Sequence, residues 1–404
     1  MTQASTSSTS DSDASSVAKA PRLALWSLLI GNLFIGTGFQ MPVGILHLIA
    51  EAQAVSVARA GALMWAGGII LAIGAPAMAW LTSQIDRRKL LATALLVYVI
   101  GHALSALVAD FNLLLGLRLL TLMGAAIFGA QSVATVGLLV PPEQRASAIA
   151  FVFIGYSAAA AAAVPLSSWL GAVAGWEATF WFVAGGSGVA LFLVAFAIPS
   201  GLRIPPVSLK TWIDVARDPV LPVILLVTLL MMTGGFTYYT FMAVDADRRL
   251  SPSPALIASL LACFGVAGVT GTILTSKAAG SMPPGLLLLV ALGFMACGLL
   301  VLALAPPQPI YYVIGFTIWG LAAFSVQPLQ QGRLVAARPP LASATAALNS
   351  TAINLGQAIG GGLGAYVISI GKPGLLAWLA ALLTISAIGL SALTDRKVAV
   401  VVRE

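Results

Sequence analysis

Residues 284–305 read PGLLLLVALGFMACGLLVLALA and contain no charged side chain. A transmembrane helix needs about 20 consecutive, predominantly apolar residues to cross the hydrocarbon core of a bilayer. Proline pairs border the segment at Pro283-Pro284 and Pro306-Pro307, and proline is a strong signal for the end of a helix. This stretch therefore predicts a helix that spans a membrane.

Similar apolar segments lie along the rest of the chain. The twelve expected spans are residues 23–46, 59–81, 90–109, 112–139, 146–171, 178–198, 219–243, 254–276, 284–305, 309–332, 342–370 and 374–393. The composition agrees, because 59% of the 404 residues are hydrophobic and only 8% are charged, whereas about 25% of the residues of an ordinary soluble domain are charged. The sequence predicts an all-α membrane protein with twelve transmembrane helices.

The polar segments divide the chain into domains. Residues 1–22 are rich in Ser, Thr and Asp, and we expect them to form a disordered tail because they cannot bury a core. The longest interior polar stretch, 199–218, separates a six-helix half at 23–198 from a second at 219–395. A second short tail is expected at 396–404.

The basic residues indicate the orientation. If the N-terminus is cytoplasmic, the outer loops contain only Arg59, Arg248, Arg249 and Lys372, and all other Lys and Arg residues except Arg118 lie inside. Cytoplasmic loops are enriched in Lys and Arg. We therefore expect both termini and the central loop in the cytoplasm. The net charge of +7 is then a topology signal, and no nucleic-acid partner is expected.

The two halves share a pattern. Pro141-Pro142 precedes the fifth span and Pro339-Pro340 precedes the eleventh, and each pair follows a Gln-bearing span. Two parallel six-helix repeats joined by a central loop are typical of secondary transporters, which bind their substrates near the bilayer midplane between the repeats.

Short motifs between residues 24 and 393 resemble those of the major facilitator superfamily. They are Gly74-Ala75-Pro76, Arg87-Arg88-Lys89, Leu115 to Arg118, Val164-Pro165, Gly175-Trp176, Trp319-Gly320, Pro328 to Gln330 and Asn349 to Gly356. Their order and spacing are similar to the drug:proton antiporter branch, near bacterial arabinose, sugar and purine-ribonucleoside efflux permeases. The resemblance implies the major facilitator fold, proton-coupled efflux by alternating access, and a path lined by spans one, four, seven and ten.

Arg118 is the only charged residue well inside an expected span. A charge inside the membrane is costly and is a functional candidate by default. The resemblance gives Arg118 a role in substrate binding or proton coupling. The alternative is a structural clamp that donates hydrogen bonds to backbone carbonyls.

Other polar and aromatic residues lie on the four spans that the resemblance places around the path. They are Asn32, Gln40, Ser132, Tyr238, Tyr239, Trp319, Gln327 and Gln330. Amides and aromatic rings among apolar side chains suit a neutral or weakly charged amphipathic solute. The alternative for each is an interhelical hydrogen bond or plain packing. His102 in the third span has two similar interpretations, a proton relay or a packing histidine.

Two further features concern conformational change. Asp86, Arg87, Arg88 and Lys89 precede the third span. By resemblance they form a charge network that holds one transport state, and the alternative is a positive-inside anchor. The resemblance also marks Pro165 in the fifth span as a conformational residue.

Proton coupling lacks an obvious acid, because no Asp or Glu lies more than about one turn inside an expected span. The nearest candidates are Glu51, Asp110, Glu177, Asp245 and Asp247 at the outer ends. The mechanism therefore divides between proton-driven efflux and passive facilitation, and uptake is a further alternative.

Other functional classes are disfavoured. The chain has no GxSxG, HExxH or P-loop motif, and its two cysteines and two histidines do not build a zinc site. A sensor would require a soluble signalling domain, which the sequence lacks. We expect no enzyme activity and no cofactor beyond a proton gradient. The expected partners are a small-molecule substrate and membrane lipid, and the expected form is a monomer in a bacterial inner membrane.

Overall fold

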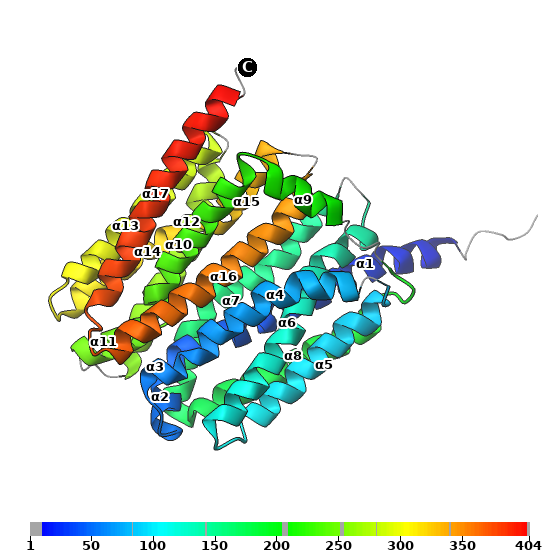
Figure 1. The fold of residues 1–404 in the computed structure, drawn as a ribbon. Helices are drawn as coiled ribbons and strands as arrows, with labels where there is room; N and C mark the ends of the chain where they lie inside the picture. Colours follow the sequence, from blue (N-terminus) through cyan, green and yellow to red (C-terminus); the bar gives the residue numbers. More distant parts are fainter. Residues whose placement is uncertain are drawn as a thin grey trace, which may run out of the picture.

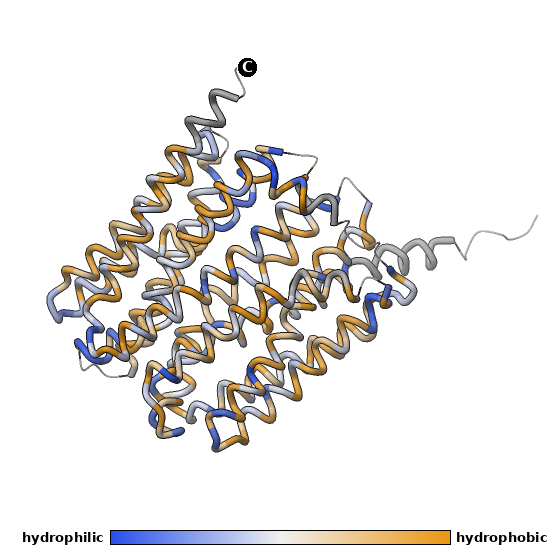
Figure 2. The backbone as a smooth tube through the Cα atoms, in the orientation of Figure 1, coloured by the Kyte–Doolittle hydropathy of each residue, from blue (hydrophilic) through white to orange (hydrophobic). Residues whose placement is uncertain are grey.

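A computed structural model describes residues 10–82, 84–141, 144–203, 209–250, 254–279, 281–338 and 341–401. In these ranges every regular element is an α-helix. Most of the helices lie side by side along one direction (Figure 1). Apolar residues occupy the middle of the helices, and hydrophilic residues gather at their two ends (Figure 2). This pattern is the one expected for a bundle that crosses a bilayer.

The helices form two halves joined by a central segment. The first half contains α1 (Ser10–Gln40), α2 (Pro42–Ala52), α3 (Val57–Ala60), α4 (Ala62–Leu81), α5 (Arg87–Ser105), α6 (Phe111–Leu139), α7 (Arg145–Ala174) and α8 (Trp176–Ala197). Helix α9 (Leu209–Arg217) lies in the central segment. The second half contains α10 (Leu221–Tyr239), α11 (Met242–Leu250), α12 (Pro254–Ala278), α13 (Pro284–Leu304), α14 (Pro309–Ala323), α15 (Val326–Ala337), α16 (Ala342–Ser369) and α17 (Leu375–Val401).

Eleven helical segments of the described chain are long and apolar enough to cross a membrane. The remaining expected span, 342–370, corresponds to α16, which has 28 residues but is not among the eleven. Its polar residues include Asn349, Thr351 and Asn354. Helix α16 packs against α10 and α4, so much of its surface contacts protein rather than lipid and tolerates these polar groups.

Several expected boundaries differ in the structure, and three of them concern polar segments. Helix α1 begins at Ser10, inside the segment expected to be a disordered tail, and the alanines of this segment favour a helix. Helix α17 likewise continues to Val401, past the expected start of the second tail. The seventh span extends to Leu250, seven residues beyond the expected end at 243, because the acidic and basic residues of α11 are compatible with a helix.

Four spans consist of two helices each. The first is interrupted at Met41 between α1 and α2, the second at Gly61 between α3 and α4, the seventh at Thr240 and Phe241, and the tenth at Phe324 and Ser325. The first, seventh and tenth are among the four spans expected to line the transport path. At the first break the cause is local, because Pro42 follows Met41 and a proline has no N–H to continue the helical hydrogen bonds.

The two halves meet along α4 with α16 and α7 with α12; α4 and α16 lie next to each other in Figure 1. Glycines make these contacts close. A Cβ added at Gly68 would lie 2.9 Å from the carbonyl oxygen of Asn354, and a Cβ added at Gly265 would contact the carbonyl oxygen of Ala161 at 2.1 Å. Small residues allow helix backbones to approach in membranes, so the interface depends on backbone packing.

Candidate functional site

Arg118 lies on α6 in the first half, and its side chain is only 1% exposed. Its Nη1 donates to the carbonyl oxygen of Gly38 at 2.7 Å and its Nη2 to that of Phe39 at 2.8 Å. Its Nε lies 3.4 Å from the carbonyl oxygen of Leu63 on α4. In this conformation the guanidinium holds the end of α1 against α6 and α4.

The break between α1 and α2 explains these partners. The carbonyl of a helical residue normally accepts from the N–H four residues later. Pro42 has no N–H, so the carbonyl of Gly38 has no helical donor. Arg118 supplies one from another helix. This geometry matches the clamp interpretation of Arg118 for this conformation.

His102 and Tyr98 of α5 close the same region. Nδ1 of His102 is 2.8 Å from the carbonyl oxygen of Tyr98, and the hydroxyl of Tyr98 donates to Ile35 at 2.9 Å. A Cβ at Gly38 would lie 2.3 Å from the Tyr98 hydroxyl oxygen, so a glycine is needed there. His102 is buried in this packing, as its packing interpretation requires.

Asp245 of α11 is a buried acid that the expected boundaries left outside the seventh span. It is 5% exposed. Its Oδ2 accepts from the hydroxyls of Tyr238 (2.8 Å) and Tyr312 (3.1 Å). Its Oδ1 lies 3.3 Å from Nε of Arg249, one helical turn away. The spacing of Asp245 and Arg249 was the available signal, since acid and base four residues apart favour a continued helix.

A hydrogen bond links the halves where the first and seventh spans break. The hydroxyl of Tyr239 on α10 donates to Oε1 of Gln40 on α1 at 2.8 Å. The Trp319 ring of α14 lies 6.4 Å from that of Tyr239 and 5.7 Å from that of Tyr238, between ring centroids. The structure thus brings four of the predicted binding residues together.

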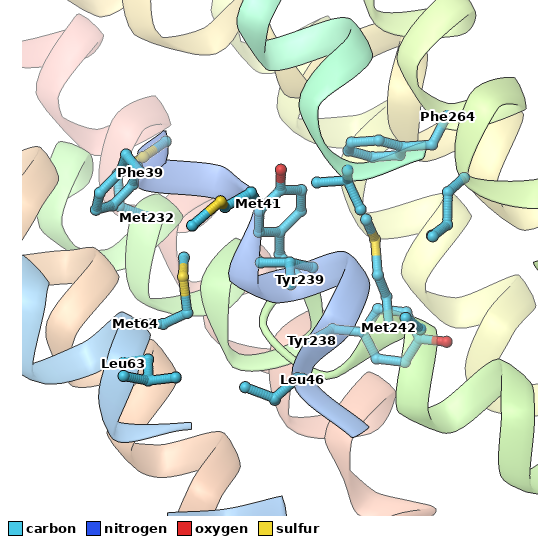
Figure 3. Close-up of a cluster of buried hydrophobic side chains, with 14 of the residues drawn as sticks. Phe39, Met41, Leu46, Leu63, Met64, Met232, Tyr238, Tyr239, Met242 and Phe264 are labelled. Atoms are coloured by element: carbon cyan, nitrogen blue, oxygen red, sulfur yellow. The ribbon is translucent and has the colours of Figure 1, made fainter. Parts of the chain in front are cut away.

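Figure 3 shows methionine and aromatic side chains in the buried cluster that contains Tyr238 and Tyr239. Met41 and Met64 come from the first half, and Met232, Met242 and Phe264 come from the second. The Phe264 and Trp319 ring centroids are 4.7 Å apart. Methionine adapts its shape to its neighbours and packs well on aromatic rings. We use the name inter-half cluster for eight residues: Gln40, Tyr239, Trp319, Met41, Met64, Met232, Met242 and Phe264.

The other predicted binding residues make further contacts in the described part of the chain, and of these only that of Gln327 is with a member of the inter-half cluster. Nδ2 of Asn32 is 3.2 Å from Oγ of Ser132, which joins α1 to α6. Nε2 of Gln327 lies 3.5 Å from Sδ of Met232, and Nε2 of Gln330 donates to the carbonyl of Ile224 at 2.8 Å. The last two contacts hold α15 against α10.

The basic motif at the start of α5 contacts the central segment. Asp86 caps α5 by accepting from the N–H of Lys89 at 3.1 Å, and it also accepts from the N–H of Gly201. Burial raises the pKa of the Asp86 carboxyl, but these backbone hydrogen bonds outweigh it and hold the pKa below its usual value of 3.8. The backbone N–H of Arg87 donates to Leu202 at 2.9 Å.

The side chains of this motif differ in burial. Arg87 is fully buried and donates to Gln131 of α6 and to the carbonyl of Thr82. Arg88 is half-buried and Lys89 is exposed. Pro165 lies in the interior of α7. A gating role for these five residues stays a prediction.

Comparisons with known proteins all indicate the same family. Residues 28–360 match the model of the Major Facilitator Superfamily. The inner membrane transport protein YdhP of Escherichia coli (strain K12) is 32% identical over 352 residues, which cover 86% of this chain and 89% of YdhP. The uncharacterized MFS-type transporter YbcL of Bacillus subtilis (strain 168) is 24% identical over 358 residues, 89% of this chain and 92% of YbcL.

Solved structures show the same fold. A variant of the peptide transporter POT in complex with alafosfalin has a TM-score of 0.74 at 14% identity, with 94% of each chain covered. A bacterial homolog of the human lysosomal transporter Spinster, inward-facing and unoccupied, has a TM-score of 0.66 at 18% identity, with 94% of this chain and 96% of that chain covered. These relatives are transporters rather than enzymes. The chain therefore belongs to the Major Facilitator Superfamily and is a multi-pass membrane transporter.

Proposed function

We propose that this transporter exports a small organic solute, such as a sugar, a nucleoside or a drug-like molecule, by proton-coupled alternating access. In this proposal it lies in a bacterial inner membrane, α16 is its twelfth span, and both termini are cytoplasmic. The end of the bundle that contains α9 then faces the cytoplasm, and the end that contains α2 and α11 faces outward. The name of YdhP, an inner membrane transport protein, supports the location.

The hydrogen bond between Gln40 and Tyr239 carries the proposal of alternating access. It joins the two halves close to the breaks in spans one and seven. Helices α2 and α11, which follow those breaks, also contact each other. A neutral hydrogen bond contributes only about 1 kcal/mol to stability. Such a contact closes the outer end and yet opens at little cost, as a rocking motion of the halves requires.

Asp245 supports proton coupling. The hydroxyls of Tyr238 and Tyr312 donate to its carboxylate, and Arg249 forms an ion pair with it. These contacts join α11 to α10 and α14. In the proposal, proton binding at Asp245 and movement of α11 are linked, because a ligand shifts an equilibrium toward the state that binds it better.

The test uses inverted membrane vesicles that carry the overexpressed protein and a pH-sensitive dye. With a pH gradient imposed, addition of a transported sugar, nucleoside or neutral drug should release protons from the vesicles. The Asp245→Asn variant should lose this dye response and retain exchange of the labelled solute. Asp218→Asn, an acid at the start of α10, is the matched control.

Two outcomes contradict the proposal. Labelled solute that equilibrates without any dye response in the wild type would identify a passive facilitator. Gradient-driven accumulation of the solute in right-side-out vesicles would identify an uptake permease.

A further inference from the structure

We infer that the inter-half cluster is a binding site for an uncharged aromatic molecule that carries one or two hydrogen-bond acceptors, and that this chemistry defines the exported substrate. The inference rests on the proposed function and narrows its substrate class. Three observations carry it: two buried donors without partners, the character of the surrounding side chains, and the pairing of the nearest charges.

The first observation is a pair of unused donors beside Tyr239. Nε1 of Trp319 and Nε2 of Gln40 are buried and have no hydrogen-bond partner among the described residues. The exposed fractions of these two residues are 2% and 6%. Burial of a polar group without a partner costs about 1–3 kcal/mol. Both groups are donors, so a bound molecule that satisfies them must offer acceptors such as carbonyl, ether or ring-nitrogen atoms.

The second observation is the apolar and aromatic surroundings. The ring of Trp319 lies 4.7 Å from that of Phe264 and 6.4 Å from that of Tyr239, and Met41 of the first half lies beside Tyr239 (Figure 3). Aromatic rings stack well on other flat rings, and methionines adapt to their outlines. A sugar would instead need many hydrogen-bonding groups around its hydroxyls, and this cluster offers few.

The third observation concerns charge. Asp245 is bonded to Tyr238, the neighbour of Tyr239, but its carboxylate is already paired with Arg249. The guanidinium of Arg118 is bonded to backbone carbonyls. A cationic or anionic substrate would have to compete with these partners in a low-dielectric environment, which is costly. An uncharged substrate avoids that competition.

The location fits a substrate site that changes access. Gln40 and Met41 lie at the break between α1 and α2, whereas Tyr239 precedes the break between α10 and α11. The two sides of the cluster belong to different halves, so a molecule bound there contacts both. Movement of one half against the other would change every contact with the bound molecule.

Binding of four probes to the full chain in lipid nanodiscs tests the inference. The probes are coumarin, a neutral flat molecule with acceptors; naphthalene, which has no acceptor; D-arabinose; and tetraphenylphosphonium. Empty nanodiscs correct for partition into lipid. Coumarin should bind saturably and most tightly. Trp319→Phe, which keeps the ring and removes the N–H, should weaken coumarin binding by about tenfold, the effect of one well-made hydrogen bond.

Matched controls separate this effect from general damage. Trp181→Phe changes a tryptophan that is 48% exposed on α8 and should leave coumarin binding unchanged. Naphthalene binding should not differ between wild type and Trp319→Phe. Gln40→Leu removes the second donor independently and should also weaken coumarin binding severalfold, so the test stands even if Trp319→Phe does not fold.

Tighter binding of arabinose or tetraphenylphosphonium than of coumarin would overturn the inference. Equal coumarin affinity in the wild type, Trp319→Phe and Gln40→Leu would do the same. Binding in nanodiscs requires no transport. Coumarin binding with no coupled efflux would therefore contradict the proposed function but support the binding site. Coupled efflux of arabinose that Trp319→Phe does not affect would contradict the binding site but support the proposed function.

Discussion

Spans one and seven are interrupted at matching places in the two halves, but the two breaks are held by opposite means. At the first break a cation on a different helix, Arg118, donates to the backbone carbonyls of Gly38 and Phe39. At the second break an acid on the helix that follows, Asp245, accepts from the hydroxyls of Tyr238 and Tyr312 and forms an ion pair with Arg249.

Because the two breaks are held by different groups, protonation can change the contacts at the second break but not at the first. A guanidinium keeps its charge in proteins, and a backbone carbonyl does not titrate. The contacts of Arg118 are therefore the same at any accessible pH. A carboxylate can be protonated and hydroxyls can reorient, so the contacts of Asp245 can change. We expect the first break to be a fixed wall of the path and the second to be its movable part.

The largest effect should follow from loss of the clamp. Arg118→Ala leaves two buried carbonyls of α1 without a donor and should lower the free energy of unfolding by roughly 3 kcal/mol or more. Pro42→Ala restores a backbone N–H opposite the carbonyl of Gly38. In the Arg118→Ala background it should therefore recover about 1 kcal/mol.

Unfolding of the purified protein in mixed micelles, with increasing denaturing detergent, measures this double-mutant cycle. Arg59→Ala, an arginine on α3 whose side chain donates to exposed Asn112, is the control and should change stability by less than about 1 kcal/mol. Strict additivity of Arg118→Ala and Pro42→Ala would show that the guanidinium does not replace the missing proline N–H.

The second break should respond in transport rather than in stability. Tyr312→Phe removes one hydroxyl donor to the carboxylate of Asp245. It should slow the dye response by about fivefold, because one hydrogen bond contributes about 1 kcal/mol. The initial rate of the dye response in the vesicle assay measures the change. Tyr311→Phe, at the exposed neighbouring tyrosine, should leave that rate unchanged.

The contrast between the breaks also explains what could be predicted from the sequence. Apolar runs place eleven spans close to their observed ranges, because bilayer thickness fixes their length. The first break has a local signal in Pro42. The second has none, since residues 240 and 241 are Thr and Phe, and it depends on packing between helices.

The candidate site was also predictable only in part, because some of its features have a local sequence signal and others depend on packing between helices. The sequence identifies Gln40, Tyr239 and Trp319 as polar or aromatic residues on the expected path, but their mutual contact depends on the meeting of two halves far apart in sequence. The sequence places Asp245 at the outer end, because the charged residues that follow it resemble the end of a span. Only tertiary contacts with Tyr238 and Tyr312 reveal it as buried.

A smaller effect is expected where the two breaks meet. Tyr239→Phe removes the hydrogen bond to Gln40 and should increase the population open at the outer end by about fivefold, which corresponds to about 1 kcal/mol. Spin labels at Glu51→Cys on α2 and Arg248→Cys on α11, in a background without Cys263 and Cys297, report the distance across this end. Tyr366→Phe, at an exposed tyrosine of α16, is the control. An unchanged distance distribution in Tyr239→Phe would mean that this bond does not hold the halves together.

The smallest effect should come from Asp218, an acid that is paired with an arginine, as Asp245 is, but lies outside the expected spans. Asp218 accepts from the N–H groups of Val220 and Leu221, and Nε of Arg338 lies 2.7 Å from its Oδ2. Burial raises the pKa of Asp218, but these hydrogen bonds outweigh it and hold the pKa below its usual value of 3.8. Its stabilisation is therefore present above that pH and is lost as the pH falls through the lower value in the folded protein.

Asp218→Asn should consequently lower the free energy of unfolding by about 1 kcal/mol at neutral pH, the typical contribution of a hydrogen bond, and the difference from wild type should shrink at acid pH. Thermal unfolding at pH 7 and at pH 3.5 measures both effects. Its dye response should equal that of the wild type, because Asp218 precedes α10 and lies at the opposite end of that helix from the break at Thr240 and Phe241. Asp245→Asn should abolish the dye response. If Asp218→Asn abolished it as well, proton coupling would not depend on the position of Asp245 at the second break, and the proposed role of that break would be wrong.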